Sequence, residues 1–280
     1  MQVGNKSALV NGTKKVLDVA PIIHNKIVYI PAKFIAESFD KKVLWNRTNS
    51  SIIIYNQSEL NKVKDIILKA DGIIKNSKTY KYALDSVLEH NGGSEYRVEY
   101  IMNFEVDMKN KAAHTTCLNK LSLSGINRTS YSERYLSDGF LYTKKESQWI
   151  KSKLQGSLEE TEFIKQEIYY GVLGEFLSDC DLAGLIVKNN PNSDVIVLEG
   201  DIGSCEMERG PFRSYKPHTK ITINKNTYLY QEKKVQVNYI EKYGGKYSVI
   251  ETFNGYEING QYNFTVPEEA INAKLLELEN

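Results

Sequence analysis

Residues 96–107 read YRVEYIMNFEVD, and this stretch decides the fold of most of the chain. Apolar and polar side chains alternate along it, with Ile101 as the exception. The apolar side consists of Tyr96, Val98, Tyr100, Met102, Phe104 and Val106. Because successive strand side chains point to opposite faces, the pattern predicts a long strand with one aromatic-rich face and one solvated face. A sheet of such strands can enclose an apolar interior without a reacting group, which favours a binding or carrier protein over an enzyme.

Turn dipeptides predict that more strands follow as an antiparallel meander. Asp138-Gly139, Gly244-Gly245 and Asn259-Gly260 each separate two strand-like segments. Such dipeptides adopt the positive φ angles of tight hairpins, whereas parallel strands would need long crossovers.

Two helices are predicted beside these strands. The first begins after a linker at residues 56–59, with Ser58 as the expected N-cap and an apolar stripe that consists of Leu60, Val63, Ile66, Ile67 and Ile74. The second spans about Leu158 to Ile186, where apolar residues recur at three- and four-residue steps; Asp181 and Gly184 indicate a break near its end. Because an apolar helix stripe covers the apolar face of a one-sided sheet, the fold class is predicted to be α+β.

The first 55 residues form a separate unit with an Asn11-Gly12 turn and a predicted helix at 32–39, in which Phe34, Ile35 and Phe39 have the spacing of buried positions. Its most characteristic segments are Val10-Asn11-Gly12, Asp18-Val19-Ala20-Pro21, Tyr29-Ile30-Pro31, Phe34-Ile35-Ala36-Glu37, Val43-Leu44-Trp45 and Ile52-Ile53-Ile54. Through these segments residues 7–55 resemble the copper amine oxidase-like N-terminal domain, which occurs on many secreted and cell-surface proteins of Gram-positive bacteria. The chain departs from that family at Asp40, where Gly is usual, and at Asn46, where Asp is usual.

The resemblance does not extend to amine oxidase chemistry, which needs copper held by several His and a Tyr in an Asn-Tyr-Asp/Glu context. The four His are scattered without a His-x-His pair, and Asn238-Tyr239 is followed by Ile240. We therefore expect a non-catalytic module, no enzyme activity and no cofactor.

The rest of the chain resembles a second family through four short motifs. They are Gly139-Phe140-Leu141-Tyr142, Gln148-Trp149-Ile150-Lys151, residues 221–229 (ITINKNTYL) and residues 264–270 (FTVPEEA). These motifs are similar to those of lipoprotein carriers, a family of lipoprotein chaperones and lipid-carrying envelope lipoproteins. The resemblance implies two domains, a small α/β module at residues 1–57 and a curved antiparallel β half-barrel covered by helices at residues 58–280. It also implies that the half-barrel holds a lipid or another hydrophobic small molecule.

The residues predicted to line that cavity are the apolar side of the 96–107 strand and one residue from a later strand. They are Tyr96, Val98, Tyr100, Met102, Phe104, Val106 and Trp149. The same alternation is equally typical of a filled core beneath a helix, so cavity and core both remain open. The 19 Tyr favour a cavity slightly, because a phenol tolerates a partly wet wall. Trp149 has two interpretations as well, at a pocket mouth or in the core.

No metal site is predicted. The three cysteines, Cys117, Cys180 and Cys205, lack the close spacing of a zinc site; one disulfide with a free thiol, or three thiols, are both possible. His114 lies three residues before Cys117, a spacing that puts the two side chains on opposite faces of a strand.

No catalytic constellation stands out either. Glu159, Glu160 and Glu162 fall in the opening turns of the second predicted helix, where acids favour the helix dipole, and Asp179 and Asp181 are read as solvated too. The glycine-containing loop at residues 200–205 lacks the Lys-Ser/Thr of a phosphate-binding loop and is interpreted as a β-turn.

Bulk properties restrict partners and location. A net charge of +1 without a basic stripe argues against nucleic acid, and no run approaches the roughly 18 apolar residues of a membrane helix. Residues 1–6 lack the apolar core of a signal peptide, so the protein is cytosolic or a leader has been removed. The two resemblances favour the second case and an extracellular or cell-surface location.

These expectations combine into a prediction of function. The chain is expected to be a non-catalytic secreted or cell-surface protein that binds a lipid or other amphiphile, with the N-terminal module serving attachment or interaction. The alternative is a structural or interaction protein of the cell envelope, with a filled core, that binds a protein or a cell-wall polymer through its surface.

Overall fold

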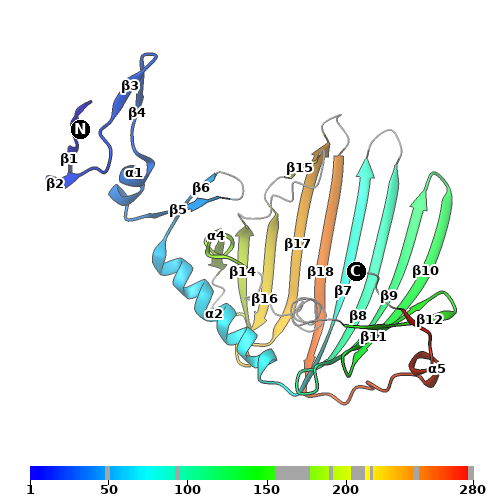
Figure 1. The fold of residues 1–280 in the computed structure, drawn as a ribbon. Coiled ribbons are helices and arrows are strands. Elements are labelled where there is room, and N and C mark those ends of the chain that lie inside the picture. Colours follow the sequence, from blue (N-terminus) through cyan, green and yellow to red (C-terminus); the bar gives the residue numbers. More distant parts are fainter. Residues whose placement is uncertain are drawn as a thin grey trace.

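The computed structural model describes residues 1–47, 51–91, 95–154, 177–188, 192–202, 212–214, 217–241 and 246–276. Thirteen strands within these ranges form one large curved sheet (Figure 1). Along the sheet the order is β13 (Leu185–Lys188), β14 (Val195–Asp201), β16 (His218–Asn224), β17 (Tyr230–Glu241), β18 (Lys246–Ile258), β7 (Thr79–Asn91), β8 (Tyr96–Asp107), β9 (Ala112–Leu123), β10 (Ile126–Ser137), β11 (Phe140–Lys145), β12 (Gln148–Lys153) and β19 (Leu275–Leu276). β15 (Phe212–Ser214) pairs with β17 off this path.

All pairs in this sheet are antiparallel except β12 with β19. The curved, open sheet confirms the predicted α+β fold with an antiparallel half-barrel. Its centre is built from parts that are distant in sequence, because β18 pairs with β7 and so joins the C-terminal strands to the first strands of the sheet.

The predicted turns have different outcomes. Asp138 and Gly139 have φ angles of 52° and 75° and connect β10 to β11, as predicted. Gly244-Gly245 lies outside the described residues. The hairpin predicted at Asn259-Gly260 is wrong: Asn259 donates its backbone N–H to the carbonyl of Thr79 at 2.8 Å, and the Gly260 carbonyl accepts from the Thr79 hydroxyl at 2.8 Å. These bonds tie the end of β18 to the start of β7, and the chain continues without a returning strand.

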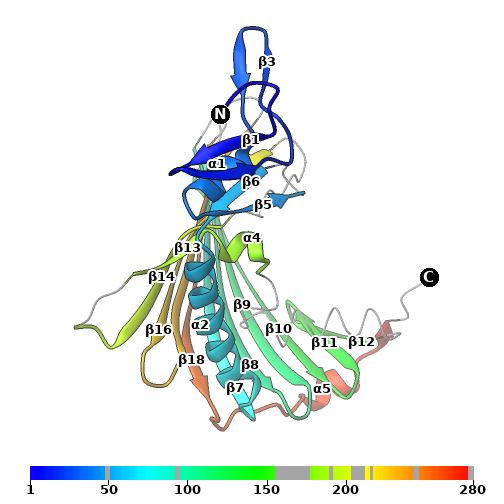
Figure 2. The same ribbon diagram turned by 90° about the vertical axis from the view of Figure 1, so that its left-hand side faces the viewer.

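Helix α2 (Gln57–Lys75) runs lengthwise along the curved sheet (Figure 2). Its predicted stripe is confirmed, since Leu60, Val63, Ile67 and Ile74 are buried in the main core with Ile66 packed against them. The predicted cap is wrong by two residues: the side chain of Asn56 accepts hydrogen bonds from the backbone N–H groups of Ser58 and Glu59.

The second predicted helix lies largely outside the described residues; its predicted end at Ile186 is wrong, but the break indicated by Asp181 and Gly184 is confirmed. Residues 179–182 form the short helix α4 (Asp179–Leu182), but β13 begins at Leu185. The predicted β-turn at residues 200–205 does not begin at Gly200, because Gly200 and Asp201 belong to β14; residues 203–205 lie outside the described residues. A Cβ on Gly184 would lie 1.9 Å from the carbonyl oxygen of Asp201, so this close approach of β13 and β14 requires glycine.

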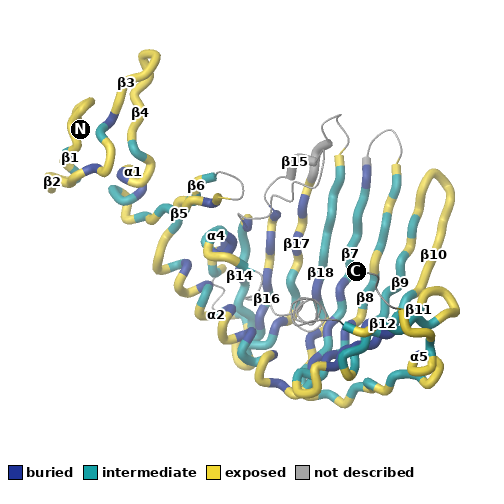
Figure 3. The backbone as a smooth tube through the Cα atoms, in the orientation of Figure 1, coloured by how far each residue is buried: buried dark blue, intermediate teal, exposed yellow. Residues whose placement is uncertain are grey.

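The N-terminal residues form three two-stranded sheets and a helix. They comprise β1 (Ser7–Val10), β2 (Thr13–Val16), β3 (Ile22–His24), β4 (Ile27–Tyr29), α1 (Ala32–Ser38), β5 (Lys42–Asn46) and β6 (Ser51–Tyr55). The predicted helix is confirmed and Phe34 is buried, but Ile35 and Phe39 are 37% and 72% exposed, contrary to the prediction. The small core of this region is Ala8, Leu17 and Phe34, and Figure 3 shows how much of the remainder is exposed.

The third two-stranded sheet leads directly into α2. β6 ends at Tyr55 and α2 begins at Gln57, with the capping residue Asn56 between them.

Candidate functional site

The candidate site is the inner face of the large sheet, defined as the face that packs against α2. Phe104 and Val106 of β8 lie in the same core cluster as the α2 residues Leu60, Val63 and Ile67. Alternation along β8 puts the other predicted residues of that strand, Tyr96, Val98, Tyr100 and Met102, on this face too.

One end of the inner face is a filled core. The Tyr82 ring stacks on Phe104, with ring centroids 4.5 Å apart, and on Tyr256 at 5.5 Å. The Tyr230 hydroxyl donates to Oδ1 of Asp71 on α2 at 2.7 Å. Burial, followed by the neighbouring Asp71 carboxylate, raises the pKa of Tyr230 well above its ordinary value. At this end of the inner face the aromatic side chains fill the space, as in the filled-core interpretation of the sequence.

The inner face becomes more accessible toward the other end of β8. Phe104 is 3% exposed, Met102 is half-buried and packs against the core, and Tyr100 is 39% exposed. The six predicted residues of β8 thus divide into Phe104 and Val106 in the filled core, Met102 packed against it, and Tyr96, Val98 and Tyr100 beyond it. The alternation could not separate these groups, because it identifies a face and says nothing of what covers each position.

Trp149 does not join this set. It pairs with Lys144, which pairs with Glu133, and this row continues through Thr116 to Asn103 on β8. Asn103 points away from the inner face, so Trp149 lies on the outer face. There it packs in a separate cluster with Tyr135, Tyr142 and Ala270. Its inclusion among the cavity-lining residues was wrong, because the sequence gives no cross-strand register.

An aliphatic row crosses the inner face beyond the filled core. Its members share one register across five neighbouring strands and are Val237, Val249, Leu88, Val98 and Leu121. None of them belongs to the cluster that packs against α2. Sequence reasoning selected Val98 alone, although alternation in the other four strands could have signalled the rest.

Polar side chains also occur on the inner face, and sequence reasoning missed them. Thr219, Glu251 and Asn119 lie on β16, β18 and β9. Burial raises the pKa of the Glu251 carboxyl, and the charge of Lys233 opposes that shift.

The outer face carries two histidines, each between two carboxylates. His114 Nδ1 lies 3.1 Å from Glu105 Oε2, and its Nε2 lies 3.0 Å from Glu133 Oε1. His218 lies between Asp201 and Glu199, whose side chains raise its pKa. The imidazole nitrogens of both residues lie within hydrogen-bond distance of these carboxylates, and no cluster of three or more metal-ligating His, Cys, Asp or Glu side chains occurs within the described ranges.

The structure shows the surroundings of two cysteines and two of the acidic residues considered in the sequence analysis. Cys117 pairs in register with Met102 and His114 with Glu105, so the two lie on opposite faces as predicted. Cys117 and Cys180 are free thiols with raised pKa values, chiefly because of burial; Cys205 lies outside the described residues.

Two of the five acidic residues considered in the sequence analysis are described. Asp179 forms an ion pair with Lys64 at 2.6 Å, and Asp181 caps the backbone N–H of Ser178. Glu159, Glu160 and Glu162 lie outside the described residues.

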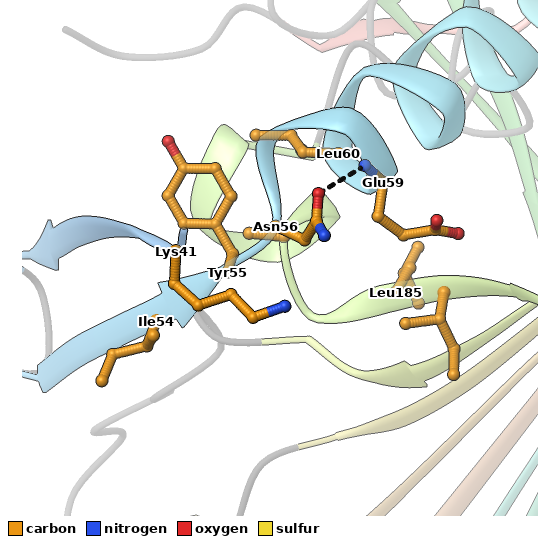
Figure 4. Close-up of a pocket in the computed structure, with 9 residues that line it drawn as sticks. Lys41, Ile54, Tyr55, Asn56, Glu59, Leu60 and Leu185 are labelled. Atoms are coloured by element: carbon orange, nitrogen blue, oxygen red, sulfur yellow. Dashed lines mark hydrogen bonds between the residues drawn. The ribbon is translucent and has the colours of Figure 1, made fainter. Parts of the chain in front are cut away.

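Two pockets lie away from the inner face. The larger, about 260 Å³, is formed where β6 and Lys41 meet α2 and β13 (Figure 4). One polar group in its wall is already engaged, because Glu59 Oε1 accepts a hydrogen bond from the Val187 N–H at 3.0 Å. The smaller, about 140 Å³, lies on the outer face beside Glu89 and Arg97. In the described part of the chain, no helix is long and apolar enough to cross a membrane.

One comparison with known proteins matches the N-terminal region, and others match the larger part of the chain. Residues 1–54 match the family model of the copper amine oxidase N-terminal domain. No curated protein matches the sequence.

Among solved structures, LprF from Mycobacterium bovis is 9% identical with a TM-score of 0.36; the similarity covers 75% of this chain and 98% of LprF. A DUF1329 family protein from Desulfovibrio piger is 10% identical with a TM-score of 0.29, covering 74% of this chain and 97% of that protein. A putative outer membrane lipoprotein-sorting protein domain from Vibrio parahaemolyticus is 10% identical with a TM-score of 0.23, covering 77% and 97%.

At these TM-scores the structural similarities carry no argument about ligand or activity. The family match is independent of them and confirms the sequence prediction for the N-terminal region: residues 1–54 match the copper amine oxidase N-terminal domain.

Proposed function

We propose that this chain is a non-catalytic, secreted or cell-surface protein that binds a lipid or another amphiphile on the inner face of its half-barrel. The observation that carries the proposal is the aliphatic row, five side chains that extend the apolar inner face beyond the part packed against α2. Burying apolar ligand surface there would stabilise a complex by about 25 cal/mol per Å². The proposal divides the chain into residues 1–57 and residues 58–280.

The N-terminal module is proposed to serve attachment or interaction. It carries many of the exposed large hydrophobic side chains of the described chain, among them Leu9, Val16 and Phe39 at 70%, 80% and 72% exposure. Both strands of the β3–β4 hairpin are exposed along their whole length. Contiguous exposed apolar surface of this kind is typical of interaction sites.

Native mass spectrometry of the purified protein, with organic extraction of bound material and a soak in a lipid panel, tests the proposal. A bound mass of lipid size that extraction removes would support amphiphile binding. A bare chain mass after the soak, together with no uptake of N-phenyl-1-naphthylamine, would contradict it.

The second candidate is a cell-envelope interaction protein that binds a protein or a cell-wall polymer through its surface. The stacking of Tyr82 on Phe104 favours it, because that end of the inner face is already filled. The same experiment separates the two candidates, since a filled core takes up no apolar dye.

A further inference from the structure

A second row crosses the inner face next to the aliphatic row, and its composition is different. We call it the polar row; its polar members are Thr219, Glu251, Ser86, Tyr100, Asn119 and Ser130, with Val235 between Thr219 and Glu251. The two rows are two residues apart along each strand, which is about 7 Å. The polar row therefore borders the apolar surface that the proposed function assigns to the ligand.

Two buried polar atoms in this row have no hydrogen-bond partner among the described residues. They are the hydroxyl oxygen of Thr219 and Oδ1 of Asn119. Thr219 is 0% exposed. Buried polar atoms in folded proteins are nearly always hydrogen-bonded, so each orphaned atom calls for an explanation.

Glu251 is the charged member of the row. It lies in register between Val235 on β17 and Ser86 on β7. Burial raises the pKa of its carboxyl, and the charge of Lys233, two residues from Val235 on the same face, acts to lower that pKa. A carboxyl in such surroundings is stabilised by any group that donates a hydrogen bond to it.

Exposure varies along the row. Thr219 is fully buried, Tyr100 is 39% exposed and Ser130 is exposed. Glu251 and Asn119 are separated by three strand spacings, about 14 Å along the sheet. The hydroxyl groups of Ser86 and Tyr100 lie between them in the same row.

We propose that the polar row binds the polar group of the amphiphile, with a hydroxyl, amide or ammonium donor of that group bonded to Glu251 or Asn119, while its apolar chain lies on the aliphatic row. This inference rests on the proposed function and specifies which ligands the inner face selects. A row that served the fold alone would gain nothing from a buried Asn119 Oδ1 and Thr219 hydroxyl left without hydrogen-bond partners among the described residues. An apolar ligand without donors would leave those acceptors unsatisfied and would bind more weakly.

The test compares two ligands with the same acyl chain, monopalmitoylglycerol with two hydroxyl groups and methyl palmitate with none. Each displaces N-phenyl-1-naphthylamine from the full-length protein, and the ratio of the two affinities is the readout. The variants are Asn119→Leu and Glu251→Leu. Asn103→Leu is the matched control, because Asn103 lies on the outer face of β8 and is exposed.

The wild type and the Asn103→Leu control should prefer monopalmitoylglycerol by about tenfold, the effect of one hydrogen bond to a charged or buried acceptor. At least one of Asn119→Leu and Glu251→Leu should reduce this preference severalfold in a protein whose melting curve shows that it is folded. A leucine variant that does not fold is replaced by Asn119→Ala or Glu251→Ala, so that both positions are tested.

Two other outcomes overturn the inference and are distinguishable. If the wild type takes up the dye but both variants keep its preference, or the wild type has none, the polar row is not the recognition site and the proposed function stands. If the wild type takes up neither dye nor lipid, the proposed function fails, and the role of the polar row fails with it.

Discussion

Tyr82 and Phe104 lie side by side on β7 and β8 with ring centroids 4.5 Å apart and ring planes within 4° of parallel. This stacked pair belongs to the core cluster that includes the buried residues of α2. Only two residues further along β8, Met102 is already less buried, and Tyr100 is exposed. The pair therefore lies in the part of the inner face that stabilises the fold, and the proposed function assigns the ligand to positions beyond Met102.

Replacing Phe104 with Ala should destabilise the protein by about 3–5 kcal/mol, because it removes a buried aromatic ring and leaves a cavity. Tyr100→Ala, on the same face of the same strand, should cost about 1 kcal/mol or less, since Tyr100 is 39% exposed. Urea unfolding of both variants measures the difference. If both variants lost the same free energy of unfolding, the two side chains would be equally well packed, contrary to this prediction.

Tyr100→Lys should reduce uptake of N-phenyl-1-naphthylamine at least about tenfold, because a charge on an apolar binding surface must be desolvated. The matched control is Tyr131→Lys, as Tyr131 is also exposed but lies on the outer face, opposite Leu118. Fluorescence titration provides the comparison. Unchanged uptake in a folded Tyr100→Lys variant would place binding elsewhere.

Glu251→Gln should make the protein more stable than wild type at pH 7, with a difference that disappears below about pH 4. Burial raises the pKa of this carboxyl in the folded state above its value in the unfolded chain. The folded state therefore favours the protonated form, and the wild type loses stability as the pH rises through the raised pKa. Melting temperatures of both proteins from pH 4 to pH 8 measure this. A difference that does not vary with pH would contradict the assignment.

Asn56→Ala should destabilise the protein by about 1 kcal/mol, because Asn56 caps the exposed N–H groups at the start of α2. Ser58→Ala should have a smaller effect, since the Ser58 hydroxyl donates to Asn56 and caps no backbone group. Thermal unfolding of the two variants distinguishes the observed cap from the predicted one. A larger loss for Ser58→Ala would restore the sequence interpretation.

The sequence by itself determined the features that depend on short-range periodicity. Alternation at residues 96–107 identified the inner side of β8, helical spacing identified the stripe of α2, and Asp138-Gly139 identified a hairpin. Each follows from side-chain direction or backbone conformation within a few residues. The segments of the N-terminal module likewise sufficed to indicate its family, because they lie within one short stretch.

The tertiary structure alone decided which residues are neighbours across strands. Trp149 lies on the outer face, contrary to the prediction. Thr219, Glu251 and Asn119 lie in one row, although they are far apart in sequence. The order of the strands and their register set these relationships, above all the pairing of β18 with β7. A two-residue period tells which side chains of one strand share a face; it contains no information about which strand lies beside it, and that is decided by how the whole chain buries its apolar surface.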